Sequence, residues 1–375
     1  MGSLERMPPS DLISFARGAP SADIIDLDGL REAAGKAFEE DPAGTTAYGT
    51  AIGYVPLRAW IAEKHGVDAS QVIVTNGSMQ ADAFLFDTLV EPGDAVVVER
   101  PTYDRTLLGL RQRGAEIVPV DLEPDGIDVD ALAKLLEGGL RPKLAHIIPN
   151  FQNPAGYTLS REKRDRLLEL AREYDFLVFE DDPYVELRFA GATLPTMLSL
   201  DESDHVVYAS SFSKTVCPGI RVGYLVGPTD VISKIVYLAT NTYISPNMVA
   251  QSIVNQFVRG GRIQGSIETV KNALRERAAR LGDALRRELP EARFQPTEGG
   301  YFMWVDLPDD VDVDAVFTAA GERGVAFVKG SDFLLEGGEH SLRLAYSGVT
   351  PEQIDEGVKR LAEAVRAATG VAQTA

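Results

Sequence analysis

One lysine lies in a short polar segment that is unusual for a buried part of a protein. Lys214 ends the run Ser-Ser-Phe-Ser-Lys, and Arg221 follows seven residues later. The flanking residues 205–209 and 222–226 are apolar and strand-like, so the segment between them is expected to be a loop that joins two buried strands. A cation in such a loop needs an anion or a covalent partner nearby.

The amine of Lys214 is therefore a candidate nucleophile. An ordinary lysine has a pKa of about 10.4 and is protonated at neutral pH, but burial or a neighbouring cation activates the amine to form Schiff bases with carbonyl compounds. Arg221 is placed to supply that cation and to bind a phosphate. Alternatively, Lys214 is a solvated loop lysine, and Ser211 and Ser213 are ordinary turn residues.

Two other loops place polar groups where a predicted strand ends. In residues 76–80 (Asn-Gly-Ser-Met-Gln) a strand ends in glycine and a helix begins, so backbone N–H groups and the Ser78 hydroxyl form a candidate phosphate site. In residues 150–154 (Asn-Phe-Gln-Asn-Pro) the proline holds Asn153 extended, which fixes its amide as a donor above the sheet edge. The ordinary alternatives are a serine helix cap and a turn.

A third loop combines a carboxylate with a phenol. Residues 180–184 (Glu-Asp-Asp-Pro-Tyr) follow another predicted strand. Asp181 and Tyr184 can bracket a heteroaromatic ring, with the carboxylate on a ring N–H⁺ and the phenol on a ring oxygen; a protonated pyridine of this kind is an electron sink that needs an acidic partner. A polar exit from a strand explains the same residues without a ligand.

The elements that must position these loops alternate in type. Between about residue 70 and 228, short apolar runs at 71–75, 95–98, 116–120, 144–148 and 176–179 are each followed by a helical stretch or a polar loop. Near-continuous Val, Ile and Leu runs separated by helices indicate strands covered on both faces, hence an α/β fold with a mostly parallel sheet. Ligands on such a sheet bind at the carboxyl ends of the strands.

A second, smaller α+β unit is expected at the C-terminus. Residues 229–289 are predicted to be helical, with a long charged helix over about 263–289 that links two domains. Short strands at 302–305, 325–328 and 342–345 and helices at about 313–322 and 351–367 follow. We therefore predict an N-terminal segment over 1–45 that packs with the small domain, a large domain over 46–285 and a small domain over 286–375.

Composition narrows the possible partners. The 375-residue chain has a net charge of -19, which disfavours nucleic acid and anionic membranes and favours a small ligand held at a local cationic site. It has one cysteine, Cys217, and four scattered histidines, so we expect neither a disulfide nor a metal site. Without an apolar run of membrane-span length or a signal sequence, the protein is expected to be cytoplasmic.

Taken together, the order and spacing of these motifs resemble the class I/II aminotransferases, which are pyridoxal phosphate enzymes of fold type I. The resemblance runs from residues 13–20 (Ile-Ser-Phe-Ala-Arg-Gly-Ala-Pro) through 48–58 to 342–347 (Leu-Arg-Leu-Ala-Tyr-Ser), so it covers almost the whole chain. Within that class the sequence is most similar to the branch of 2-aminoadipate and kynurenine aminotransferases and the effector domains of MocR regulators. The resemblance implies a large domain with a seven-stranded type of sheet covered by helices.

The resemblance also implies roles for the matching residues. Lys214 would hold pyridoxal 5′-phosphate as a Schiff base and move the substrate proton, with Asp181 on the ring nitrogen and Tyr184 on the ring oxygen. Tyr103 would stack on the ring. The cofactor-binding residues implied in this way are Tyr48, Gly77, Ser78, Met79, Tyr103, Asn153, Asp181, Tyr184, Ser211, Ser213, Lys214 and Arg221.

Substrate and subunit contacts follow from the same resemblance. Arg343, a cation among apolar strand residues, would bind the substrate α-carboxylate as a fork together with Asn153; alternatively it is an edge-strand arginine that faces water. Arg17 either recognises an acidic side chain or is solvated. Tyr48 matches a family tyrosine that reaches the phosphate of the neighbouring subunit, which implies a homodimer with two shared active sites.

The sequence departs from the family pattern near the substrate. Asp104 and Arg105 replace a small or apolar pair after the stacking tyrosine, and Lys329 stands where relatives often have proline. We therefore predict an aminotransferase that works by a ping-pong mechanism from an L-amino acid to a 2-oxo acid, with 2-oxoglutarate as the expected acceptor. The alternatives are another pyridoxal phosphate reaction, such as a β-lyase or an amino acid oxidase, and a MocR-like effector module.

Overall fold

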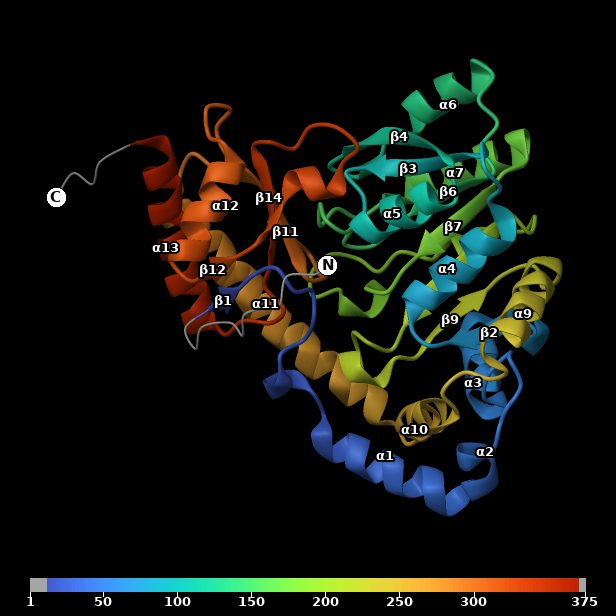
Figure 1. The fold of residues 1–375 in the computed structure, drawn as a ribbon. Coiled ribbons are helices and arrows are strands. Elements are labelled where there is room, and N and C mark those ends of the chain that lie inside the picture. The colour runs from blue at the N-terminus through green and yellow to red at the C-terminus, as the bar shows by residue number, and fades with distance from the viewer. Residues whose placement is uncertain (1–11, 371–375) are drawn as a thin grey trace.

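The computed structural model describes residues 12–370 and has two parts joined by one long helix. Figure 1 shows the larger part around an extended sheet and the smaller part, in orange and red, beside it. The long helix α11 (Arg262–Glu288) passes between the two parts, close to the range predicted from its charge pattern. The predicted domain boundaries at 45 and 285 stay predictions, and the ends of the outer segments, 1–11 and 371–375, lie outside the described residues.

The large part contains a mixed, mostly parallel sheet of eight strands in the order β2-β9-β8-β7-β6-β3-β4-β5. The pairs β3–β4, β3–β6, β6–β7 and β7–β8 are parallel, and β9 runs antiparallel to both of its neighbours. The strands are β2 (Val72–Thr75), β3 (Ala95–Arg100), β4 (Glu116–Glu123), β5 (Gly126–Ile127), β6 (Leu144–Ile147), β7 (Leu177–Asp181), β8 (Val206–Ser211) and β9 (Gly223–Val226).

Helices cover both faces of this sheet, as the continuous apolar runs predict. Alternate residues of β3 show the two faces: Val96 and Val98 pack in the core under α4, α5 and α9, whereas Val97 packs in the core under α6 and α7. The helices of the large part are α3 (Val55–His65), α4 (Ser78–Leu89), α5 (Asp104–Gln112), α6 (Val129–Glu137), α7 (Arg161–Tyr174), α8 (Met197–Leu200), α9 (Thr229–Tyr243) and α10 (Met248–Arg259).

The small part is an antiparallel sheet with helices packed against it. Its strand order is β10-β11-β14-β13, and the aromatic and aliphatic side chains of β11 and β14 share a core with α11, α12 and α13. These elements are β10 (Arg293–Phe294), β11 (Phe302–Asp306), β13 (Val328–Lys329), β14 (Ser341–Ala345), α12 (Val313–Glu322) and α13 (Pro351–Thr369). The α+β architecture predicted for the C-terminus is therefore present.

The N-terminal segment contacts both parts of the molecule. Its first strand β1 (Ile13–Ser14) pairs in parallel with β12 (Val325–Ala326) of the small part. The chain then crosses to α1 (Leu27–Glu40) and α2 (Pro42–Thr46), which pack against α10 of the large part, along the lower edge in Figure 1. The segment is thus a second connection between the two parts, beside α11.

Two details of the strands differ from the sequence prediction. The predicted strand 325–328 is divided at Phe327, because its first half pairs with β1 and its second half pairs with β14 in another sheet. The two-residue strand β5 pairs antiparallel with the end of β4 and was not predicted, since two residues carry no periodic pattern.

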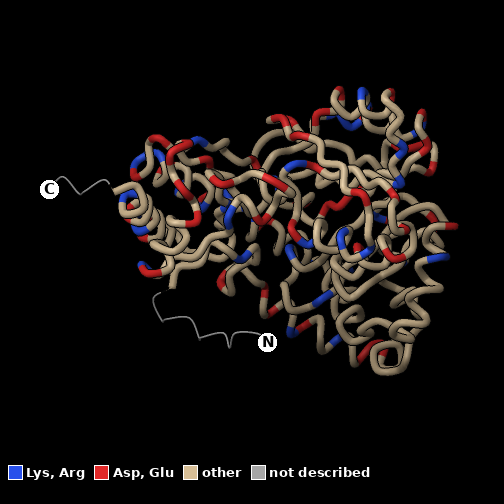
Figure 2. The backbone as a smooth tube through the Cα atoms, turned by 45° about the horizontal axis from the view of Figure 1, so that its top comes forward, with Lys and Arg blue, Asp and Glu red and all other residues tan. Residues whose placement is uncertain are grey.

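Charged residues are distributed over both parts. Figure 2 shows acidic and basic positions interspersed along the described chain, in keeping with many short-range ion pairs on helix surfaces. Among the described helices, none is both long and apolar enough to span a membrane.

Candidate active site

A cavity of about 410 Å³ lies between the two parts, at the carboxyl ends of β7 and β8 and at the start of α4. This is where a mostly parallel sheet is expected to bind its ligand. The predicted site residues that line it are Arg17, Ser78, Met79, Tyr103, Asn153, Asp181, Tyr184, Ser211, Ser213, Lys214, Arg221 and Arg343.

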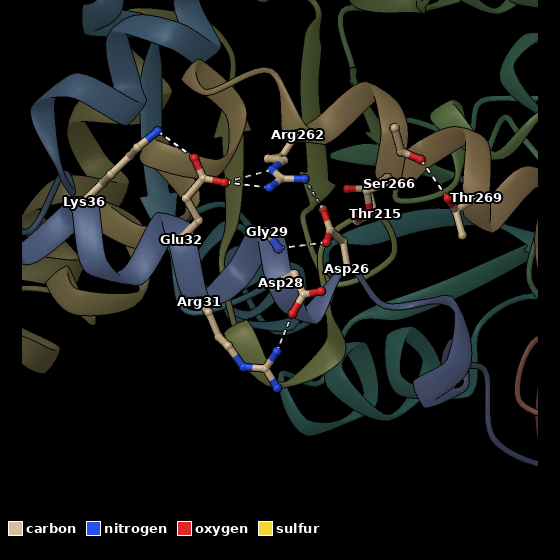
Figure 3. A network of polar contacts seen from close by, with 11 residues as sticks. Asp26, Asp28, Gly29, Arg31, Glu32, Lys36, Thr215, Arg262, Ser266 and Thr269 are labelled. Atoms are coloured by element: carbon tan, nitrogen blue, oxygen red, sulfur yellow. Dashed lines mark hydrogen bonds and ion pairs between the residues drawn. The ribbon is translucent and has the colours of Figure 1, made fainter.

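Lys214 lies in this cavity on a loop that is fixed from both sides. Its Nζ donates a hydrogen bond to Gly18 O at 2.9 Å, and its backbone carbonyl accepts one from the Tyr301 hydroxyl at 3.2 Å. The next residue, Thr215, is held by the Ser266 hydroxyl of α11, which donates to its carbonyl at 2.6 Å (Figure 3). The loop is thereby tied to the long helix that joins the two parts.

The same corner of α11 is tied to the N-terminal segment. Figure 3 shows Arg262, the first residue of α11, between Asp26 and Glu32, and its Nη2 lies 2.6 Å from Glu32 Oε2. These exposed ion pairs each contribute little energy, but together they connect α1 to the helix that supports the Lys214 loop.

The surroundings of Lys214 favour its neutral amine. Burial, and then the positive charges of Arg221 and Arg343, lower the pKa of Lys214 to about 8, while Asp181 acts in the opposite direction. This value lies well below the ordinary lysine pKa of about 10.4, so a much larger fraction of the amine is unprotonated near neutral pH than in an ordinary lysine. The predicted activation of this lysine by burial and a neighbouring cation is therefore present in the structure.

The start of α4 and the loop after β8 form a compact anion cradle. Gly77 is the N-cap of α4 with φ of 89°, and a β-carbon at this position would collide with the Arg221 guanidinium. Arg221 Nη1 lies 3.1 Å from Ser213 Oγ, and Ser213 N donates to Ser211 Oγ at 3.1 Å. A helix N-terminus, two hydroxyls and a guanidinium together suit a phosphate group.

Asp181 is the last residue of β7 and lines the cavity. Its carboxylate is buried, and Oδ2 lies 3.5 Å from His146 Nε2, which fixes its orientation. The other oxygen, Oδ1, has no hydrogen-bond partner among the described residues. Tyr184, three residues later, is also buried, and burial raises the pKa of its phenol well above the usual range. A buried carboxyl group with one unpaired oxygen and a neutral phenol thus line the same cavity.

Arg343 comes from the small part and closes the cavity. Its side chain is only 6% exposed, so the alternative of a water-facing arginine does not hold. One guanidinium nitrogen donates to Asn153 Oδ1 at 2.8 Å, another donates to Ala16 O at 2.6 Å, and Phe302 and Phe333 cover the faces of the group. Arg343 Nε has no partner within residues 12–370. Burial lowers the pKa of Arg343 to about 10.

Two predicted residues stand apart from the cavity lining. Gly77 borders the cavity through the Arg221 guanidinium rather than lining it. Tyr48 is 88% exposed on the large part and does not line the cavity. The Tyr103 hydroxyl, by contrast, contacts Met79 Sδ at 3.8 Å within the cavity wall.

The cavity also contains residues that sequence reasoning did not name. Asp82, Phe302 and Phe333 line it, and Gly18 binds the lysine amine. Asp82 lies one helical turn after Ser78 on α4, so the i, i+4 spacing was a signal that could have placed it on the same face. The two phenylalanines carried no such signal, because apolar residues in strands and loops usually belong to the core.

Comparison with known proteins identifies the family. The family model for aminotransferase class I and II matches residues 10–361. The chain belongs to this family. The protein from Thermus thermophilus named 2-aminoadipate transaminase is 35% identical over 95% of this chain and 90% of its own length. Aromatic-amino-acid aminotransferase 1 from Thermococcus litoralis is 33% identical over 97% of this chain and 90% of its own.

A solved aminotransferase has the same fold. The crystal structure of LysN, the alpha-aminoadipate aminotransferase of Thermus thermophilus in complex with N-(5′-phosphopyridoxyl)-L-leucine, matches with a TM-score of 0.92. It is 34% identical, and the match covers 97% of this aminotransferase and 94% of that chain. The fold class, the aminotransferase activity and the pyridoxal phosphate cofactor predicted from the sequence are therefore confirmed.

The residues of this aminotransferase fit that cofactor. The close approach of the Arg221 guanidinium to Gly77 forms a cradle that suits the phosphate, and the carboxylate of Asp181, which lines the cavity, would accept from a ring N–H⁺. Lys214, whose pKa is lowered to about 8, would supply the amine that joins the cofactor aldehyde. Bound there, pyridoxal phosphate supplies the electron sink for the substrate carbanion.

Proposed function

We propose that this aminotransferase moves the amino group of an L-amino acid to a 2-oxo acid by a ping-pong mechanism, with 2-oxoglutarate as the acceptor. The observation that carries the proposal is the position of Arg343 and Lys214 in one cavity, with a fork for a carboxylate at one end and an activated amine at the other. In a ping-pong cycle both substrates enter the same space in turn, so a single carboxylate site serves both.

Each residue has one task in this proposal. Arg343 binds the α-carboxylate of either substrate through its fork, and Asn153 holds that fork in place through the 2.8 Å hydrogen bond. Lys214 accepts the α-proton and returns it on the cofactor side, because its neutral amine is accessible near neutral pH. Asp181 keeps the cofactor ring nitrogen protonated, and Tyr184 orients the ring oxygen.

Asp104 and Arg105 border the substrate space. Both line the cavity, and Arg105 Nε lies 3.4 Å from Asp104 Oδ2. An ion pair here makes the mouth of the cavity polar, where the family pattern has small or apolar residues. Together with the exposed Arg17, it favours donors whose side chains carry a polar or charged end.

We also propose a homodimer with two shared sites. Tyr48 is 88% exposed, and Tyr237 and Ile244 are 76% and 63% exposed, which leaves large apolar side chains uncovered on the large part. The Asn247 N–H donates to Asn76 Oδ1 at 2.9 Å, so the start of α10 lies against the loop that begins the phosphate cradle. A second copy that covers this surface would bring its Tyr48 to that cradle.

Subunit complementation tests the shared site. A mixture of Lys214→Ala and Tyr48→Ala subunits should gain activity on exchange, because half of the mixed dimers' sites then contain both Lys214 and the partner's Tyr48. If Tyr48 served its own subunit, every site in a mixed dimer would keep one defect and no activity would return. A monomer in sedimentation at micromolar concentration would contradict the dimer itself.

The half-reaction tests the mechanism. Addition of an amino acid alone to the loaded enzyme should convert the visible absorbance of the bound cofactor and release one 2-oxo acid per site, before any acceptor is present. A panel of amino acids then identifies the donor, with 2-oxoglutarate and other oxo acids as acceptors. Release of ammonia, or of a side-chain fragment, would assign a different reaction on the same cofactor. We place the enzyme in the cytoplasm, which fractionation can test.

A further inference from the structure

The buried carboxyl group of Asp82 has no part in the roles given above. Asp82 lies on α4 one turn after Ser78 and lines the active-site cavity together with Asp181. Its side chain is 9% exposed, and Asp181 is 5% exposed. Among the residues that the structure describes, neither Asp82 Oδ1 nor Asp181 Oδ1 has a hydrogen-bond partner. Two buried acids, each with one carboxyl oxygen that has no partner, therefore line one cavity.

Nearby cations do not neutralise Asp82 in the described structure. The titratable or charged groups that share a cavity with it are Arg17, Tyr103, Asp104, Arg105, Arg113, Asp181, Tyr184, Lys214, Arg221 and Arg343. Arg105 already pairs with Asp104 at 3.4 Å, and Arg113 pairs with Asp87 at 2.5 Å. Lys214 and Arg343 donate to backbone carbonyls of residues 18 and 16.

Two ionised carboxylates in one enclosed cavity repel each other and lose hydration, so one of them is expected to keep a proton. Burial, and then the charge of Asp181, raise the pKa of Asp82 well above its ordinary value. Asp181 has the geometry to be the anion, because His146 Nε2 lies 3.5 Å from its Oδ2 and the residue lines the cavity that would hold a ring N–H⁺. Asp82 has no comparable partner in residues 12–370.

We propose that Asp82 is a positioning residue that remains protonated beside Asp181, so that Asp181 alone carries the negative charge at the ring-nitrogen end of the cofactor site. A neutral carboxyl group donates one hydrogen bond and accepts others, whereas a second carboxylate would compete with Asp181 for the cationic ring. The proposal rests on the proposed function only in that pyridoxal phosphate binds in this cavity.

A packing role alone is a poor explanation for an acid at this position. An apolar side chain would fill the same space without an unpaired polar atom, and an unpaired buried polar group costs free energy. The acid at position 82 therefore lowers the stability of the fold, which indicates a role in the active site rather than in packing.

Infrared spectroscopy tests the proton directly. The full-length loaded enzyme and its Asp82→Asn variant are compared at neutral pH, and their difference spectrum should contain the C=O stretch of a protonated carboxyl group. Asp87→Asn is the matched control, because Asp87 lies on the same helix but is exposed and paired with Arg113. That control should instead lose a carboxylate band. A carboxylate band from Asp82 would overturn the proposal.

Cofactor affinity tests the role. Asn keeps a neutral polar group that can donate to Asp181, so Asp82→Asn should bind pyridoxal phosphate within about threefold of the wild type, whereas Asp82→Ala removes this donor and should bind roughly tenfold more weakly. The pH midpoint of the bound cofactor's visible absorbance should shift in Asp82→Ala and be restored in Asp82→Asn.

Any other combination of cofactor affinities and pH midpoints in the two variants contradicts the proposed role of Asp82. An Asn variant as weak as the Ala variant would mean that Asp82 acts as an anion, and an Ala variant equal to wild type in affinity and midpoint would mean that it does not act on the cofactor. Absence of the visible band from the wild-type enzyme would instead contradict cofactor binding, and thus the proposed function. The infrared result would remain interpretable in that case.

Discussion

The two ends of the active-site cavity are built differently. At the cofactor end, Ser78, Ser213 and Arg221 all come from the large part: Arg221 contacts Ser213 eight positions away, and its guanidinium lies against the start of α4 at Gly77. At the substrate end, Arg343 comes from the small part and is held by Asn153 and by the carbonyl of Ala16. The first end lies within the large part alone, whereas the second is assembled from the small part, the large part and the N-terminal segment.

This difference indicates how substitutions should affect cofactor binding and substrate selection. A cradle formed within one sheet edge does not depend on how the two parts are placed, so cofactor binding should tolerate changes in the small part. The substrate end depends on the position of residues 16–18, which touch Arg343 through Ala16 and Lys214 through Gly18. Substitutions there should alter substrate selection before they alter cofactor binding.

The largest effect is expected at the lysine that serves both ends. Lys214→Ala should reduce turnover on the order of 10³-fold, in the range typical of a lost general acid–base group, and it can still bind the cofactor non-covalently. Borohydride reduction of the wild-type enzyme should attach the cofactor to Lys214, as peptide mapping would detect. A label on Lys64, which is held in a separate ion pair with Glu186, would end this assignment.

Asp181→Ala should have the next largest effect and should act at the cofactor end alone. Without its charge the ring nitrogen is not kept protonated and the carbanion is poorly stabilised, so turnover should fall roughly 10²- to 10³-fold, as for other lost electrostatic stabilisers. The cofactor dissociation constant should rise as well. Asp181→Asn, which keeps the shape, should bind cofactor better than the alanine variant but recover little turnover. Full activity in Asp181→Ala would place the electron sink elsewhere.

Arg343→Ala should act mainly at the substrate end. The KM values for the amino acid and the 2-oxo acid should rise together, because both substrates present the same α-carboxylate to a desolvated fork. The increase should correspond to about 2–5 kcal/mol of lost binding free energy. Arg343→Lys should recover only part, since an ammonium group cannot make the bidentate contact. Cofactor affinity should stay within a few-fold. Unchanged KM values would move the carboxylate site away from Arg343, and Arg17 would be the next candidate.

The pKa of Lys214 links the two ends. Arg343 is one of the cations that lower this pKa to about 8, so its removal should raise the pKa and decrease the neutral amine present near pH 7. The rate at which the cofactor-free enzyme takes up pyridoxal phosphate should therefore fall in Arg343→Ala at pH 7 and approach the wild-type rate at higher pH. Stopped-flow absorbance over a pH series would measure this, and identical pH profiles would show that the two charges are not coupled.

The same contrast explains what the sequence could predict. The strands of the large sheet, the start of α4 and the Lys214 loop follow from local patterns, since apolar runs and turn residues are encoded over a few neighbouring positions. Arg343 was named through the family resemblance, and its position as a cation in an apolar strand supported that assignment. Gly18 as the acceptor for Lys214 could not be found, because the contact spans 196 positions and the backbone carbonyl carries no sequence signal. Asp82 was missed although its helical spacing from Ser78 was available.

The division of residues 325–328 between two sheets was not predicted for the same reason. A run of apolar residues predicts a strand but not its partner, and Val325 pairs with β1 whereas Val328 pairs with β14. The contact of α1 with α10 likewise depends on where the chain crosses between the two parts. The contacts that build the substrate end join segments distant in sequence, so local sequence patterns could not predict them.

The smallest predicted effect concerns the charges at the cavity mouth. Arg17 is exposed and adjoins Gly18, so Arg17→Ala should lower kcat/KM for acidic amino acids several-fold and leave aromatic ones nearly unchanged. Arg105→Ala should have a weaker effect, because Asp104 already offsets its charge at 3.4 Å. The ratio of kcat/KM for an acidic and an aromatic donor is the measurement, since it cancels any shared loss. Equal losses for both donors would show that Arg17 supports the segment that contacts Lys214 and Arg343, and that side-chain selection arises elsewhere in the cavity.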